Sequence, residues 1–341
     1  MKQKREDVRN IAIIAHVDHG KTTLVDELLK QSGVFRENQE VAERVMDSND
    51  IERERGITIL SKNTAVYYKD TKINIIDTPG HADFGGEVER VLKMVNGVIL
   101  VVDAFEGVMP QTKFVLMKAL DLKLPVIVCV NKVDRPEARP NEVVDEVLEL
   151  FMDLDASDEQ LDCPFLYASA KAGFAVRNLD DPRENMVPLF ETIIEHIPAP
   201  EGDPTEPLKA LIFDALYDSY KGVIVFCRVK EGTVKVGDKI KMMATGAMDE
   251  VTEVGYFGAG QFIPCDELSA GMVGYICASI KNVRDTRVGD TVTNADRPCA
   301  EALPGYKKVN PMVYCGLYPA DSAKYPDLRD ALEKLQINDA S

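Results

Sequence analysis

Residues near the N-terminus of the chain have the types and the spacing of a phosphate-binding loop. Ala15 is followed, after four residues, by Gly20, Lys21 and Thr22. In such a loop, backbone N–H groups and the start of the next helix surround a di- or triphosphate, because both present positive ends of dipoles. Gly20 would let the backbone approach, the Lys21 ammonium would reach the β- and γ-phosphates, and the Thr22 hydroxyl would offer an oxygen to Mg²⁺.

This loop departs from the common pattern at one position, and it contains a second arrangement that could do different chemistry. Ala15 stands where the pattern has Gly. His16 and His19 have the spacing of a metal-binding pair. We favour the phosphate loop, because it already explains the position of both histidines and no third metal ligand is evident.

A second group of candidate residues follows a later apolar run. Residues 72–77 end in Asp77, and Gly80 and His81 come soon after it. A carboxylate at the carboxyl end of a strand is placed to hold Mg²⁺ through water, and the Gly80 amide can reach a γ-phosphate. Alone, Asp77 could simply cap a strand-to-helix turn. Together with the phosphate loop, the segment favours a metal and phosphate role.

Two further segments could select a base. One follows an apolar run and contains Asn131, Lys132 and Asp134. The other follows the run 165–168 and contains Ser169, Ala170 and Lys171, whose amides could contact the base oxygen. The Asp134 carboxylate can accept from both N1–H and the exocyclic amine of guanine, donors that adenine does not offer in this arrangement. Asp134 therefore predicts GTP rather than ATP.

Alternating strands and helices must position these groups. Apolar runs that suit strands cover residues 10–15, 64–68, 72–77, 97–103 and 125–134. Patterns that suit helices cover residues 24–29, 86–95 and 111–120. This alternation predicts a doubly wound, mostly parallel sheet with ligand groups at the carboxyl ends of its strands.

The domain organisation can be predicted from changes in composition and in the secondary-structure pattern along the chain. A Pro- and Gly-rich stretch at residues 198–204 indicates a boundary, so we expect an α/β nucleotide-binding domain over residues 1–200. Short strands between Gly and Asp turns predict an all-β barrel over residues 201–300. Residues 301–341 predict the start of an incomplete α+β domain, because so few elements cannot bury a core. Its predicted elements are a strand at 311–317 and a helix at 326–335.

Composition narrows the class of protein. The chain has 341 residues, of which 45% are hydrophobic and 28% charged, as in globular proteins with more than one core. No apolar stretch reaches the roughly 18 residues of a membrane span, and residues 1–7 lack an apolar signal region, so we expect a cytoplasmic protein. The net charge of −17 disfavours DNA binding and non-specific RNA binding. Any RNA partner would therefore have to bind a local surface patch. Seven cysteines without a CxxC pair predict reduced thiols.

Five motifs in this order resemble those of the translational GTPases, the elongation-factor superfamily. They lie at residues 15–22, 55–58, 77–81, 131–134 and 169–171. The resemblance covers essentially the whole chain. It implies an α/β P-loop GTPase domain followed by a β-barrel, with GTP and GDP as ligands, Mg²⁺ as cofactor and the ribosome as partner.

The resemblance also implies roles for individual residues. Thr58 would bind Mg²⁺ when γ-phosphate is present, and His81 would position the attacking water. Val17 and Ile57 match an apolar pair that gates His81, and Asp18 matches a residue linked to a monovalent cation such as K⁺. The predicted catalytic residues are His81, Val17, Ile57 and Lys21, and the predicted metal ligands are Thr22, Thr58 and, through water, Asp77. The predicted nucleotide contacts are Asp18, His19, Gly20, Lys21, Thr22, Thr23, Gly80, Asn131, Lys132, Asp134, Ser169, Ala170 and Lys171.

Within this superfamily, the two halves of the chain look like different members. Segments that look like BipA (TypA) lie at residues 49–59, 81–90 and 131–140. Segments that look like LepA lie at residues 201–204, 217–222, 302–308 and 335–341. Because the change falls near the linker, we expect a hybrid of a BipA-like first half and a LepA-like second half.

Two functions fit these observations. The first is a ribosome-dependent GTPase in which γ-phosphate contacts order one segment and hydrolysis releases it. The second is a GTP/GDP-switched module that binds a protein partner and hydrolyses GTP slowly. An ATP-dependent enzyme is disfavoured, because Asp134 selects guanine.

Overall fold

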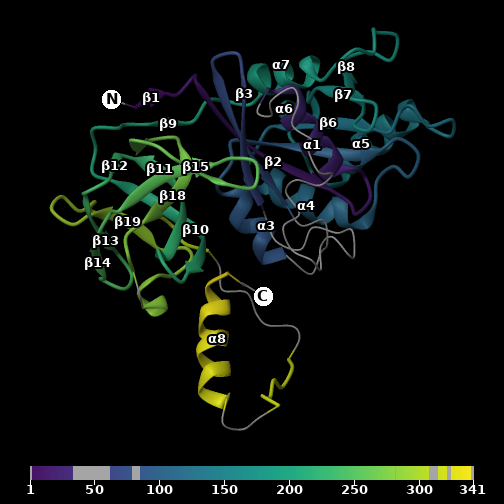
Figure 1. Cartoon of the computed structure of the whole chain (residues 1–341). Coiled ribbons are helices and arrows are strands. Elements are labelled where there is room, and N and C mark those ends of the chain that lie inside the picture. Colours follow the sequence, from purple (N-terminus) through teal and green to yellow (C-terminus); the bar gives the residue numbers. More distant parts are fainter. Residues whose placement is uncertain are drawn as a thin grey trace. The chain divides into compact units, whose positions relative to one another are not determined.

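The structure, a computed structural model, describes residues 2–33, 62–78, 85–280, 282–306, 314–320 and 324–338 (Figure 1). The chain divides into two compact units. The first unit contains Arg5–Pro200 and Phe257–Gln261. The second unit contains Met1–Lys4, Glu201–Tyr256 and Phe262–Ser341.

The first unit is built on a seven-stranded sheet in the order β3-β4-β2-β5-β6-β7-β8. Its strands are β2 (Val8–Ala15), β3 (Lys62–Tyr68), β4 (Thr71–Asp77), β5 (Gly97–Asp103), β6 (Val126–Asn131), β7 (Phe165–Ser169) and β8 (Phe174–Val176). The five strands from β4 to β7 in this order pair in parallel, and the edge strands β3 and β8 are antiparallel. The predicted mostly parallel sheet is confirmed.

Helices cover both faces of this sheet, as two-sided burial of parallel strands requires. The described helices of this unit are α1 (Lys21–Gln31), α3 (Gly85–Leu92), α4 (Pro110–Asp121), α5 (Pro140–Asp153), α7 (Val187–His196) and the short α6 (Asp158–Leu161), which buries no side chain. On one face, Leu24 of α1 and Phe190 of α7 share a core with Ile11 and Ile13 of β2. The alternate residue Ile14 is also buried but lies on the opposite face, where α4 contacts β2.

The second unit is an antiparallel β domain, which confirms the prediction of an all-β fold for this part of the chain. Its main sheet has eight strands in the order β14-β13-β19-β10-β11-β18-β15-β16. These strands are β10 (Lys209–Asp218), β11 (Gly222–Glu231), β13 (Lys239–Met242), β14 (Met248–Glu250), β15 (Glu253–Phe257), β16 (Phe262–Pro264), β18 (Val273–Cys277) and β19 (Thr291–Asn294). Two short pairs are β1 (Gln3–Lys4) with β9 (Glu201–Gly202) and β12 (Thr233–Lys235) with β17 (Glu267–Ser269). Along β11, Val223, Val225, Cys227 and Val229 alternate into the core.

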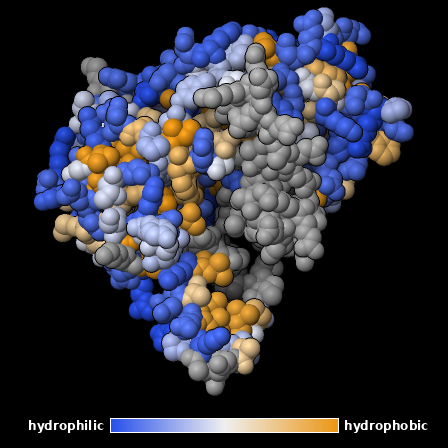
Figure 2. Space-filling view, in the orientation of Figure 1, coloured by the Kyte–Doolittle hydropathy of each residue, from blue (hydrophilic) through white to orange (hydrophobic). Residues whose placement is uncertain are grey.

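The C-terminal residues differ in part from the prediction. Residues 311–313 of the predicted strand lie outside the described residues, and Tyr314–Leu317 is not a strand, so this prediction is wrong for the described part. The predicted helix is present as α8 (Tyr325–Asn338), whose Glu333 pairs with Arg284 of the short helix η2 (Val283–Asp285) at 2.6 Å. Several apolar side chains of this segment are exposed, among them Leu317, Tyr318 and Leu332, and Figure 2 shows hydrophobic surface over this segment.

Two other observations bear on the class of protein. Among the described residues, no helix combines the length and the apolar character that crossing a bilayer demands. All seven cysteines are free thiols, as predicted, and four of them are buried.

Phe190→Ala should lower the free energy of unfolding by about 3–5 kcal/mol, because it removes a buried aromatic ring and leaves a cavity. Phe190 is 1% exposed and stacks on Tyr68 with ring centroids 5.0 Å apart. Urea unfolding followed by circular dichroism measures the change. Phe105→Ala, at a ring that is 49% exposed, should change it by less than about 0.5 kcal/mol. Equal losses for the two variants would contradict the assignment of Phe190 to the core.

Candidate nucleotide-binding site

The predicted phosphate loop joins the end of β2 to the start of α1. Gly20 precedes α1 with φ of +90°, a conformation that favours glycine. A Cβ at Gly20 would overlap Asn131 Nδ2, so space also excludes a side chain. No side chain caps the N-terminus of α1 in the described structure, so its first-turn amides remain available to an anion.

A buried ion pair lies beside this loop. Asp77 ends β4, the strand next to β2, and its Oδ1 is 2.9 Å from Lys21 Nζ. The Asp77 side chain is fully buried and that of Lys21 is 7% exposed. Thr78 anchors the end of β4, because its hydroxyl donates to the Ile13 carbonyl at 2.8 Å. The predicted metal-holding carboxylate and the phosphate-reaching ammonium are thus brought together.

The predicted base segment is connected to the phosphate loop by one side chain. Asn131, at the end of β6, is 1% exposed. Its Nδ2 donates to the His19 carbonyl at 2.9 Å, and its Oδ1 accepts from the Ala170 N–H at 3.0 Å. The Ala170 N–H thus donates to Asn131 in this structure, and the contact of this amide with a base stays a prediction. Asp134 is exposed, and its carboxylate has no partner among the described residues.

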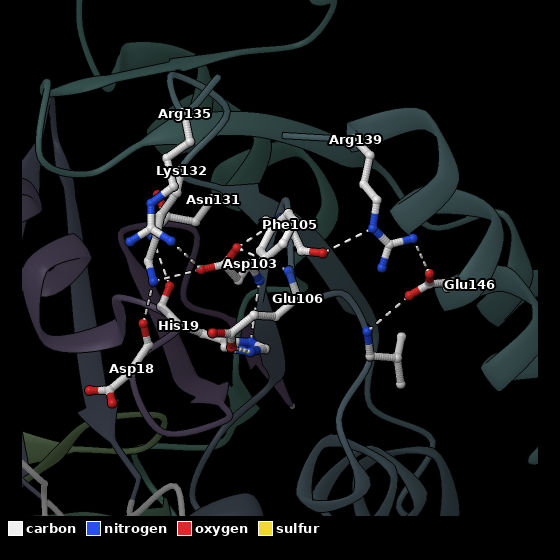
Figure 3. A network of polar contacts seen from close by, with 11 residues as sticks. Asp18, His19, Asp103, Phe105, Glu106, Asn131, Lys132, Arg135, Arg139 and Glu146 are labelled. Atoms are coloured by element: carbon white, nitrogen blue, oxygen red, sulfur yellow. Dashed lines mark hydrogen bonds and ion pairs between the residues drawn. The ribbon is translucent and has the colours of Figure 1, made fainter. Parts of the chain in front are cut away.

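A second connection runs through Asp103 at the end of β5 (Figure 3). The Asp103 side chain is fully buried, and its Oδ2 is 2.6 Å from Lys132 Nζ. Its Oδ1 accepts from the N–H groups of Phe105 at 2.8 Å and Glu106 at 3.3 Å. The same Lys132 ammonium donates to the Asp18 carbonyl in the phosphate loop. Burial alone would raise the pKa of the Asp103 carboxyl, but Lys132 and the two amides outweigh it, so this pKa lies below its ordinary value.

The loop that follows β5 is held from α5. Arg139 Nε donates to the Phe105 carbonyl at 2.9 Å, and the Arg139 guanidinium pairs with Glu146. Glu146 in turn accepts from the Val108 N–H at 3.2 Å (Figure 3). These contacts hold the loop against the start of α5.

His19 belongs to the phosphate loop and is buried against the end of β5. Its Nδ1 accepts from the Asp103 N–H at 3.2 Å, so the ring proton is on Nε2, which is 3.2 Å from Glu106 Oε2. Burial, followed by the neighbouring His16, lowers the pKa of His19. The rings of His16 and His19 have centroids 5.1 Å apart, and the described residues contain no group of three metal-ligand side chains. His19 therefore serves as a neutral hydrogen-bonding link in this structure.

Some of the remaining predicted residues are described by the structure, and the others are not. Val17 and Thr22 are partly buried, and Asp18, Thr23 and Lys171 are exposed. Ser169 is buried, and its hydroxyl accepts from the Ala172 N–H at 3.2 Å. The predictions for Ile57, Thr58, Gly80 and His81 lie outside the described residues.

The sequence interpretation missed Asp103 and Glu106. Asp103 ends an apolar run at 97–103, just as Asp77 ends its own run. Because the carboxyl ends of parallel strands meet at one edge, that position was a usable signal for Asp103. Glu106 lies in a loop, and nothing in its sequence neighbourhood predicts the contact with His19.

Comparison with models of protein families shows which family has this sequence pattern. The family model described as the elongation factor Tu GTP-binding domain matches residues 6–199. The chain belongs to this family. The model described as elongation factor Tu domain 2 matches residues 222–293 in the antiparallel β unit.

Curated relatives match the chain from end to end. "Elongation factor 4" of Agathobacter rectalis is 61% identical over 346 residues, which cover 100% of this chain and 54% of the relative. "Elongation factor 4" of Bacillus subtilis is 51% identical, with 99% and 53% covered. The chain spans about half the length of the curated relatives that it matches. Because one kind of relative, elongation factor 4 (LepA), aligns on both sides of the linker, the expected BipA-like first half is not supported.

Solved structures share the fold at low sequence identity. A bacterial selenocysteine-specific elongation factor has a TM-score of 0.66 and 22% identity, covering 84% of this chain and 45% of that one. A protein from Thermus thermophilus has a TM-score of 0.73 and 20% identity, covering 98% and 61%.

Acidification below pH 6.5 should destabilise the protein in part through His19. Its pKa in the folded state is below the unfolded value of 6.5, so between the two values the unfolded chain binds more protons and stability falls as the pH falls. His19→Asn keeps an acceptor for the Asp103 N–H and removes the titration. Urea midpoints between pH 5 and 7.5 should therefore fall less steeply in the variant. Parallel curves for the two proteins would contradict the lowered pKa.

Proposed function

We propose that the chain binds GTP and GDP at the carboxyl edge of its parallel sheet. The observation that carries this proposal is the double hydrogen bond of Asn131 to the His19 carbonyl and the Ala170 N–H. It holds a phosphate loop and a base-selecting segment as parts of one site. The exposed Asp134 carboxylate, three residues along the same segment, has free acceptors for the two guanine donors, and the Lys171 amide would contact the base oxygen.

The residues around the phosphate loop also suit Mg²⁺. The Asp77 carboxylate and the Thr22 hydroxyl are oxygen donors of the kind that this ion prefers, with Asp77 acting through water. Magnesium would supply charge neutralisation at the β- and γ-phosphate oxygens. Lys21 pairs with Asp77 in this structure. In the proposed complex its ammonium would also reach the phosphates, and the first amides of α1 would donate to them.

We further propose that the chain hydrolyses GTP and works as a translation elongation factor on the ribosome. Support comes from the name of its relatives, "Elongation factor 4", which match it over both units. Hydrolysis would require an oriented water, and His81 is the residue proposed for that role, with Val17 and Ile57 controlling its approach and Thr58 completing the metal site. Phosphoryl transfer asks the protein mainly for positioning and charge stabilisation, so no covalent intermediate is needed.

Asp134→Ala should weaken GTP binding by about 2–4 kcal/mol, because two donors of the bound base lose their acceptor. Asp134→Asn should shift preference toward xanthine nucleotides, whose 2-oxo group accepts from an amide. Calorimetry with GTP, XTP and GDP measures both effects. Glu137→Ala, at a nearby exposed acid, is the control and should bind GTP as the wild type does. Unchanged GTP affinity in Asp134→Ala would contradict the guanine assignment.

His81→Ala should keep GTP and GDP affinity within about threefold yet lose at least about tenfold of ribosome-stimulated turnover, because orienting water matters only in the transition state. Single-turnover GTP hydrolysis with and without ribosomes measures this for both proteins. A variant as fast as the wild type would remove His81 from the mechanism. A wild type that binds GTP but gains nothing from ribosomes would favour the slow binding module instead.

A further inference from the structure

The two oxygens of the Asp103 carboxylate have different partners. Oδ1 accepts from the N–H groups of Phe105 and Glu106 and so shapes the turn after β5. Oδ2 faces cations: Lys132 Nζ at 2.6 Å and, more distantly, Arg135 at 3.6 Å. Arg135 is 46% exposed and Lys132 only 20%, so Lys132 is the principal partner.

Asp103 also reaches two consecutive residues of the phosphate loop. Through its side chain it holds the Lys132 ammonium, which donates to the Asp18 carbonyl. Through its own backbone N–H it donates to His19 Nδ1. The loop is thus held from β5 at both residues, and Asp103 is common to the two connections (Figure 3).

We propose that Asp103 is a positioning residue for nucleotide binding, which acts through Lys132 to couple the base segment to the phosphate loop. The inference rests on the proposed guanine-nucleotide function and adds a residue that does not itself contact the nucleotide. It also implies that base and phosphate contacts are lost together when the coupling is removed.

Two features of the backbone make this support necessary. Asp18 and Lys132 both have left-handed φ angles, 64° and 65°, which non-glycine residues rarely adopt. Such conformations persist only where surrounding contacts hold them. The Lys132 ammonium lies between the two segments and provides that contact, while the buried Asp103 charge holds the long lysine side chain in one geometry. Holding the site in its bound shape reduces the ordering cost of binding.

The test is a double-mutant cycle on GDP affinity with Asp103→Asn and Lys132→Met. Asparagine keeps an oxygen for the Phe105 and Glu106 amides, but its NH₂ group cannot accept from Lys132. Asp103→Asn should weaken GDP binding at least about tenfold in the wild-type background, because it leaves a partly buried ammonium without its counter-charge. In the Lys132→Met background the same change should alter affinity less than about twofold.

A matched control is available in the second unit. Asp290 is also buried, and its Oδ1 likewise accepts two backbone N–H groups, from Ala244 and Thr291. Its Oδ2 has no hydrogen-bond partner among the described residues. Asp290→Asn therefore changes a buried carboxylate in the same way without touching a cation, and GDP affinity should stay within about twofold of the wild type.

The outcomes separate this inference from the proposed function. A wild type that binds no guanine nucleotide would overturn the function itself. A wild type that binds GDP, with Asp103→Asn equally tight or equally weakened in both Lys132 backgrounds, would overturn only the positioning role. Should Asp103→Asn fail to fold by circular dichroism, Asp103→Ser, which removes the charge but keeps a side-chain oxygen that can accept from the Phe105 N–H, enters the same cycle with the same expected coupling.

Discussion

The Asn131 side chain uses both its donor and its acceptor on backbone groups of two other segments. It is buried, so leaving either group unpaired would cost about 1–3 kcal/mol, and the two hydrogen bonds therefore fix the His19 carbonyl and the Ala170 N–H in place. Gly20 packs against the same amide so closely that no Cβ fits. The shape of the whole site at the sheet edge depends on this contact.

Four charged side chains at the same edge, three buried and one partly buried, form two ion pairs. Lys21 pairs with Asp77, and Lys132 with Asp103. Burying a lone charge is costly, and removing one partner of such a pair is more damaging than the pair is stabilising. These four residues are therefore poor sources of stability but strict constraints on geometry. In a chain with a net charge of −17, they place two ammonium groups where an anionic ligand would enter.

The pattern of apolar residues in the sequence was sufficient to predict most strands of the first unit. The runs ending at Ala15, Asp77 and Asp103 became β2, β4 and β5, because strands buried on both faces of a parallel sheet are apolar along most of their length. The strand predicted at 311–317 was wrong for Tyr314–Leu317, since an isolated run needs a neighbouring strand to pair with and none of the described strands pairs with these residues. Strand β8, three residues long, was not predicted, because so short an element carries no readable period.

The sequence by itself determined which residues could contact a nucleotide: a small-residue loop before a helix, an acid after one strand, and an Asn-Lys-x-Asp segment after another. These are local patterns, and local spacing is enough to recognise them. Only the tertiary structure decided which of them touch: that Asn131 accepts from the Ala170 amide, that Lys132 joins Asp103 to Asp18, and that His19 is buried beside Asp103 and Glu106, where burial lowers its pKa. Those contacts join residues up to 114 positions apart, and their distances depend on strand order and register, which residue spacing along the chain does not encode.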